Sequence, residues 1–170
     1  MDVALSFFAA HVDGSATLTL TAREPLATLE LDARDLEVFE VALAPVGTPP
    51  RGVRKAEQDA TGGRLGEASL PGDDFHACAF SLDVPRHKLV VPLPKPLAAG
   101  ETLRLFVRCR CTPSDSLLEG LYRDVTPPGA PPQFMSQCQQ WGFQRILPVI
   151  DDCTAKCTFR TTLEGDARYT

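Results

Sequence analysis

The residues whose types and spacing could do chemistry are concentrated between positions 131 and 160. This stretch contains the only tryptophan, Trp141, and three glutamines within four residues, which are Gln137, Gln139 and Gln140. If residues 137–139 are extended, the amides of Gln137 and Gln139 share one face about 6–7 Å apart. Two amide oxygens side by side can accept hydrogen bonds from a ligand ammonium or amide group. A solvated strand would show the same pattern, so both interpretations stay open at this point.

A complete set of catalytic residues is missing from the sequence. Zinc-dependent hydrolysis needs imidazole ligands, a carboxylate and a general base beside the bound water. The three histidines, His11, His76 and His87, form no H-E-x-x-H motif. Cys153 and Cys157 would supply only two metal donors with no other pair nearby, so core packing is the favoured interpretation of these two cysteines. We therefore predict no catalytic residue and no metal site in this chain, and we expect the 170-residue chain alone to be inactive.

Composition limits the partners and the compartment. A chain of 170 residues with 44% hydrophobic residues is long enough for one domain with a core. Its net charge of −5 argues against a nucleic acid or an anionic membrane as partner. The first ten residues have no basic residue before their apolar run, which is unlike a secretory signal. We expect a cytoplasmic protein whose six cysteines are reduced and buried.

The elements that must position these residues are mostly strands, because apolar residues alternate with a period of two. The clearest strand is 102–111, which has three arginines on one face: Arg104, Arg108 and Arg110. These arginines are either solvated or in contact with an acidic partner. Further strands are expected at 16–20, after a turn at Asp13-Gly14, and at 27–31, 38–43, 78–82 and 87–93, the last closed by Pro94. Residues 47–72 read as a long loop.

A single helical turn is expected at 151–156, with Asp151 as its N-cap and Asp152 as surface charge rather than half of a catalytic pair. The pattern as a whole predicts an all-β fold, a β-sandwich or saddle of mostly antiparallel strands.

The same residues resemble a known family. The segment QCQQWGFQRILPVIDDCTAKCTF, residues 137–159, resembles the signature of the amino-terminal domain of the aminopeptidase N family of zinc metallopeptidases, the gluzincins. Three shorter segments resemble that domain in the expected order, at 29–36, 96–101 and 118–123. Two positions depart from the pattern. Cys153 stands where proline is common, and Gln139 stands where most members have glutamate and the leukotriene-hydrolase-like branch has glutamine.

The resemblance implies that residues 1–170 form the amino-terminal β domain of a zinc aminopeptidase, incomplete at its C-terminal end. It implies that zinc and the hydrolytic residues belong to a downstream catalytic domain, which would be a partner of this one. Gln139 would then accept a hydrogen bond from the amino terminus of a peptide, Gln137 would line the pocket for the first side chain, and Trp141 would support the rim. Two alternatives stay open: a stand-alone, non-catalytic interaction module, and part of a bifunctional epoxide hydrolase and aminopeptidase.

Overall fold

The computed structural model describes residues 1–8, 10–45, 72, 74–131 and 133–167. Its largest element is a six-stranded sheet in which all neighbours are antiparallel except β11 and β1. In spatial order the strands are β11 (Arg160–Glu164), β1 (Asp2–Phe7), β2 (Val12–Thr21), β8 (Thr102–Cys111), β4 (Leu36–Pro45) and β5 (His76–Ala77). The prediction of an all-β fold of mostly antiparallel strands is confirmed.

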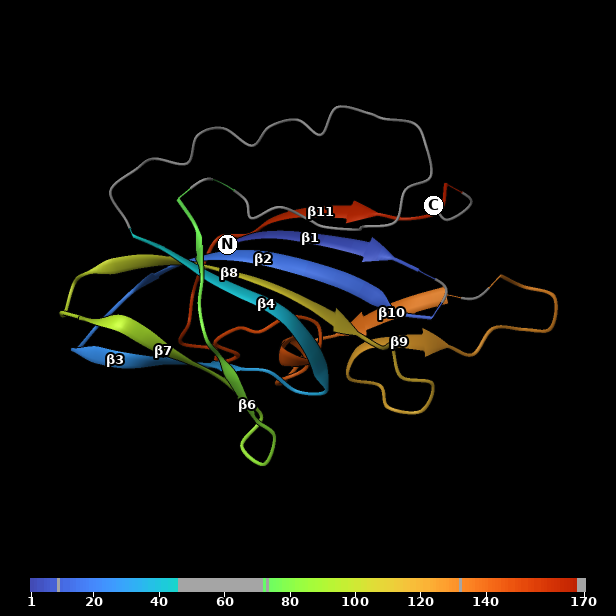
Figure 1. Ribbon diagram of the computed structural model, residues 1–170. Helices are drawn as coiled ribbons and strands as arrows, with labels where there is room; N and C mark the ends of the chain where they lie inside the picture. The colour runs from blue at the N-terminus through green and yellow to red at the C-terminus, as the bar shows by residue number, and fades with distance from the viewer. Residues whose placement is uncertain (9, 46–71, 73, 132, 168–170) are drawn as a thin grey trace.

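Two smaller sheets complete the described architecture. One has the order β3 (Leu26–Asp32), β7 (Lys88–Leu97) and β6 (Ser81–Asp83), and the other is the hairpin of β9 (Gly120–Asp124) and β10 (Gln133–Gln137). A 3-10 helix, η1 (Phe143–Arg145), is the one helix within the described ranges. Figure 1 shows both small sheets below the large one, with the coiled segment of η1 between them. No helix in this part of the chain is long and apolar enough to cross a membrane.

Strand β8 forms where the alternating pattern is strongest. Five of its apolar residues are buried on one face, as predicted: Leu103, Leu105, Val107, Cys109 and Cys111. Phe106 is buried on the opposite face, in a second small cluster with Phe75. The arginines of β8 also lie on that face, where Arg104, Arg108 and Arg110 pair with Asp74, Glu40 and Asp13, respectively. These arginines are therefore neutralised within the chain, which accounts for them without an acidic partner.

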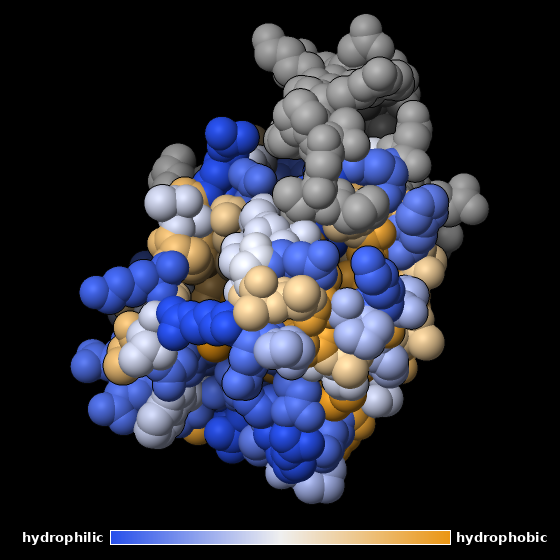
Figure 2. Space-filling model, turned by 90° about the vertical axis from the view of Figure 1, so that its left-hand side faces the viewer, coloured by the Kyte–Doolittle hydropathy of each residue, from blue (hydrophilic) through white to orange (hydrophobic). Residues whose placement is uncertain are grey.

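The main core lies between the six-stranded sheet and the elements below it. It is built from side chains of the large sheet, of β3 and β7, and of the segment after η1, and among its fully buried members are Val12, Leu31, Leu89, Leu105, Val107 and Leu147. Burial of this contiguous apolar surface is the main driving force for the fold. Seen from the left of Figure 1, hydrophilic residues cover much of the surface, with hydrophobic residues exposed between them (Figure 2).

Three local predictions are wrong. Asp13 and Gly14 lie inside β2 rather than in a turn. A Cβ atom at Gly14 would come within 2.8 Å of Leu147, so this glycine makes room for a core side chain. Strand β7 continues through Pro94 to Leu97, because β6 pairs only with its first three residues and the prolines cost no hydrogen bond on that unpaired side.

The third wrong prediction is the helical turn at 151–156, where the chain forms a non-helical turn. The carboxylate of Asp152 accepts hydrogen bonds from the backbone and hydroxyl of Thr154, and these bonds hold the pKa of Asp152 below its ordinary value. Most of the expected loop 47–72 lies outside the described residues.

The six cysteines are all free thiols. Cys109 and Cys111 are buried in the core, and burial raises the pKa of Cys111 to about 11. Cys78 is half-buried, whereas the other three are exposed: Cys138, Cys153 and Cys157. The expectation of buried thiols is therefore wrong for these three, because they lie on the turn after β10 and on the segment before β11, outside the sandwich core.

Candidate functional site

The three predicted site residues lie on one exposed turn, residues 137–142, which we name the glutamine turn. Gln137 is the last residue of β10, and Gln139 and Trp141 follow it in the turn. The turn closes with a hydrogen bond of 2.9 Å from the Gly142 amide to the Cys138 carbonyl. Gln139 is therefore not on an extended strand, and the predicted side-by-side arrangement of Gln137 and Gln139 on one strand face is wrong.

Two glycines let the glutamine turn pack closely against the hairpin. A Cβ atom at Gly142 would lie 2.2 Å from the Gln137 carbonyl oxygen and 3.0 Å from the Gly120 nitrogen. Gly120 starts β9, has a φ of 68°, and has no room for a side chain beside Arg145. The turn thus depends on glycine at both positions, which the sequence alone did not indicate.

The other side of the turn is held by η1. Gln144 is buried, and its side-chain nitrogen donates a 2.9 Å hydrogen bond to the Trp141 carbonyl. The backbone N–H of Gln144 donates to the Asp151 carboxylate at 3.0 Å, and the backbone carbonyl of Gln144 accepts from the backbone N–H of Arg34 at 2.9 Å. The prediction that Asp151 is the N-cap of a helical turn at 151–156 is therefore wrong, because its carboxylate instead accepts from a backbone amide within η1, which precedes it.

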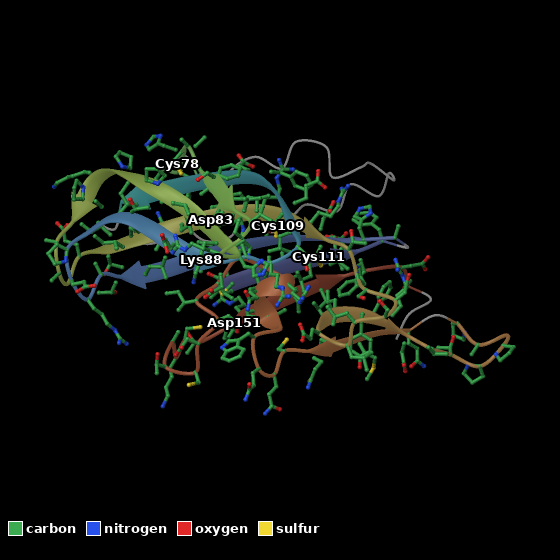
Figure 3. The ribbon with its side chains drawn as sticks, turned by 90° about the horizontal axis from the view of Figure 1, so that it is seen from below. Cys78, Asp83, Lys88, Cys109, Cys111 and Asp151 are labelled. Carbon is green, nitrogen blue, oxygen red and sulfur yellow. The ribbon has the colours of Figure 1, made fainter. Side chains whose placement is uncertain are left out.

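Asp32 connects this segment to the three-stranded sheet. Its carboxylate accepts hydrogen bonds from Lys88 Nζ at 2.5 Å and from the Asp151 amide at 3.0 Å. The backbone groups of Asp32 and Val149 exchange two further bonds of 2.6 and 3.0 Å. Figure 3 shows Asp151 beside η1 and Lys88 on the neighbouring sheet. These contacts fix the chain on the C-terminal side of the glutamine turn.

Arg145 makes a third connection. Its guanidinium pairs with Asp35 and donates from Nε to Glu119 at 3.1 Å, while only 10% of its side chain is exposed. Asp35 belongs to the segment 29–36 and Glu119 to the segment 118–123, which were singled out from the sequence. Those two segments therefore meet around η1 through Arg145.

The accessible groups of the turn are neutral. Gln137 and Gln139 are exposed, and Trp141 is 62% exposed. Asp151 is occupied by the Gln144 amide and Asp152 by Thr154, so these two carboxylates form no acid–base pair. The turn can offer amide oxygens and an aromatic face to a ligand, but it has no carboxylate or imidazole that could act as a base. Its exposed thiol, Cys138, has a pKa raised by partial burial and by the nearby Asp151 carboxylate.

No zinc site fits the described part of the chain. Nowhere in residues 1–8, 10–45, 72, 74–131 and 133–167 do three or more histidine, cysteine, aspartate or glutamate side chains form a group that could hold a metal ion. A catalytic zinc ion needs three protein ligands and an open position. We therefore derive no chemical step through a metal bound to these residues.

Comparison with known proteins gives one family. Residues 1–170 match the family described as the Peptidase M1 N-terminal domain. The solved structure of an M1 zinc metallopeptidase from Deinococcus radiodurans is 21% identical, with a TM-score of 0.68 over 98% of this chain and 31% of that chain. A two-domain M1 zinc metallopeptidase mutant bound to L-arginine is 22% identical, with a TM-score of 0.69 over 98% and 32% of the two chains. No curated protein sequence matches.

Proposed function

The chain belongs to the Peptidase M1 N-terminal domain family, and from this premise we propose that it forms one wall of the active site of a zinc-dependent aminopeptidase. In this proposal Gln139 accepts a hydrogen bond from the free amino group of the substrate. The observation that carries it is the glutamine turn, in which exposed amides stand on a backbone held from both sides by Gly142 and Gln144. A rigid support of this kind is what accurate placement of a substrate requires.

The proposal divides the work between domains. The chain spans about a third of the M1 zinc metallopeptidases that it resembles, covering 31% and 32% of their lengths. Zinc and the groups that hydrolyse the peptide bond are assigned to another domain of the whole protein. This chain would contribute recognition only, because its turn carries acceptors but no water activator.

The charge of the turn limits what it can do. A neutral amide accepts a hydrogen bond from an ammonium group, but it attracts that group less strongly than a carboxylate would. Carboxylates of the catalytic domain would therefore hold most of the ammonium charge, and Gln139 would select its direction. Gln137, at the end of β10, would line the pocket for the first side chain, and Trp141 would support the rim.

The test is the kinetics of Gln139→Ala in the complete peptidase. Loss of a hydrogen bond to a charged group costs about 1.5–3 kcal/mol, so kcat/KM for aminoacyl anilides should fall about tenfold to a hundredfold. Zinc content should not change. Gln140→Ala is the matched control, because Gln140 is an exposed glutamine on the same turn with no assigned role. Equal kinetics of Gln139→Ala and the unchanged enzyme would remove Gln139 from the site.

A further inference from the structure

The glutamine turn buries little surface of its own. The side chains of residues 137–141 are exposed, and a segment with few buried contacts opens easily unless its backbone is hydrogen-bonded. Besides its close packing against β9, the turn is held at its C-terminal end. There the Trp141 carbonyl accepts from the Gln144 side chain at 2.9 Å, and the Gly142 carbonyl accepts from the backbone N–H of Arg145 at 3.1 Å. The position of the turn therefore depends on what fixes η1.

A chain of hydrogen bonds connects Gln144 to two carboxylates and a lysine. The backbone N–H of Gln144 donates to the Asp151 carboxylate, and the backbone N–H of Asp151 donates to one oxygen of Asp32. Lys88 donates to the other oxygen of Asp32. The chain therefore runs from β7 through β3 and the segment after η1 to the Trp141 carbonyl, and its members Lys88 and Asp151 are labelled in Figure 3.

The ionic end of this chain is partly shielded from water. The Lys88 and Asp32 side chains are 28% and 23% exposed, and Nζ lies 2.5 Å from the carboxylate oxygen. Hydrogen bonds to ionised groups are stronger than those between neutral groups, and bonds joined in a chain strengthen one another. Because each oxygen of Asp32 already receives a donor, an amide in its place would leave one donor facing an NH2 group. We expect such a change to loosen every later bond of the chain.

A second carboxylate on β3, Glu30, supplies a comparison. Glu30 accepts from Arg86 at 2.6 and 3.2 Å, much as Asp32 accepts from Lys88. Arg86 also donates to Asp83, so the bonds of this pair stay within the three-stranded sheet and its connections. Glu30 and Asp32 thus share a strand, a charge and a cationic partner. Of the two, only Asp32 bonds to the segment after η1 within the described residues.

We propose that Asp32 and Asp151 are positioning residues for substrate recognition, which orient Gln139 through Gln144 and the backbone of the glutamine turn. Neither carboxylate touches the substrate in this proposal. Their role is to keep the turn at the angle at which the Gln139 side chain meets the amino group, since a small displacement of such a group weakens its hydrogen bond. The inference rests on the proposed function, because that function supplies the ligand that Gln139 binds.

The first measurement follows the turn itself in the 170-residue chain. Trp141 is the only tryptophan of this chain, so the decay of its fluorescence anisotropy reports motion at the glutamine turn. We expect Asp32→Asn and Gln144→Met to increase the amplitude of the nanosecond component, because each breaks the hydrogen-bond chain at nearly constant side-chain size. Glu30→Gln, which weakens the comparison pair, should leave the decay unchanged. Far-ultraviolet spectra check that each variant is folded, and Gln144→Met decides the test if Asp32→Asn is not.

The second measurement is a double-mutant cycle in the complete peptidase. Asp32→Asn should lower kcat/KM for aminoacyl anilides about twofold to tenfold without changing the zinc content. Added to Gln139→Ala, the same change should cause a smaller loss, because Asp32 acts on the substrate through the residue that is already missing. Glu30→Gln should leave kcat/KM unaltered with either residue at position 139.

Two results would overturn this proposal while the role of Gln139 stands. Equal anisotropy decays in the unchanged chain, Asp32→Asn and Gln144→Met would show that the hydrogen-bond chain does not hold the turn. Fully additive losses in the cycle would show that Asp32 affects turnover by a route other than Gln139. Failure of the proposed function is a separate result: equal kinetics of Gln139→Ala and the unchanged enzyme would remove the recognition role of Asp32 as well, whereas the anisotropy would still decide whether the chain of bonds fixes the turn.

Discussion

At the scale of single residues, the shape of the glutamine turn depends on Gly142. We expect Gly142→Ala to destabilise the domain by about 1–3 kcal/mol, because its Cβ atom would overlap backbone atoms that cannot move aside. The nearest of these is the Gln137 carbonyl oxygen, at 2.2 Å. Denaturant unfolding measures the change. Gly165→Ala is the control, because its Cβ atom would meet only Phe7 at 3.7 Å, and a similar loss in both variants would contradict the account.

Also at this scale, Asp13 should make stability sensitive to acid. Arg110 donates to both of its carboxylate oxygens, at 2.6 and 3.0 Å, and this outweighs partial burial and holds the pKa of Asp13 below its ordinary value of 3.8. Because the pKa of Asp13 is lower in the folded chain than in the unfolded chain, the unfolded chain binds more protons at acid pH. The stabilisation from the Asp13–Arg110 pair is therefore fully present at a pH above the unfolded-state pKa, and it is lost as the pH falls through the folded-state pKa.

Asp13→Asn should therefore lose less stability than the unchanged chain when the pH is lowered from 5 toward 3, roughly the range around a carboxyl pKa. Denaturant unfolding at several pH values measures this. Asp2→Asn is the control, since Asp2 and Arg160 lie 3.7 Å apart and both side chains are exposed. If Asp13→Asn and the unchanged chain lost the same free energy of unfolding between pH 5 and 3, Asp13 would not be the source of the acid sensitivity.

Single residues were predictable from sequence only where type and local spacing decide their role. Polar amides beside a tryptophan indicated an exposed site, and Gln137, Gln139 and Trp141 do lie together on an exposed turn. The buried Gln144 could not be distinguished from its exposed neighbours, because its position depends on two distant partners. Arg34 is more than one hundred positions away in the sequence, and Asp151 is seven positions away. The geometry of the turn was missed for the same reason.

At the scale of elements, η1 and the residues after it join the turn to the core. Leu147 is fully buried and packs against Gly14 of β2. We expect Leu147→Ala to cost about 2–5 kcal/mol, because it removes buried apolar surface and leaves a cavity beneath the large sheet. Thermal or denaturant unfolding measures it. Leu163→Ala on β11 is the control at 65% exposure, and a comparable cost there would show that Leu147 has no special role.

Elements were predictable where one face is buried and the other is polar. Strand β8 shows this alternation over ten residues, and its bounds agree with the prediction. The prediction failed at Gly14 and Pro94, because glycine and proline are typical of turns. In the structure Gly14 makes room for the core side chain of Leu147, and Pro94 lies within β7 beside an unpaired strand edge. Both reasons lie in elements distant in sequence, so local propensity could not reveal them.

At the scale of the whole molecule, the described structure is a sandwich whose glutamine turn stands outside the main core. The turn is held from below by η1 and from the side by β9. Its amides can accept hydrogen bonds, and the proposed function assigns hydrolysis to groups of another domain. The proposed function therefore depends on contact between this turn and a substrate.

The most direct test of that contact is a crystal structure of the complete peptidase with a bound amino acid. The account predicts the Gln139 side-chain oxygen about 2.7–3.2 Å from the ligand's α-amino nitrogen. It also predicts the Gln137 side chain against the first side chain of the ligand. A structure in which the α-amino group is bound entirely by other residues, with Gln139 facing solvent, would contradict it.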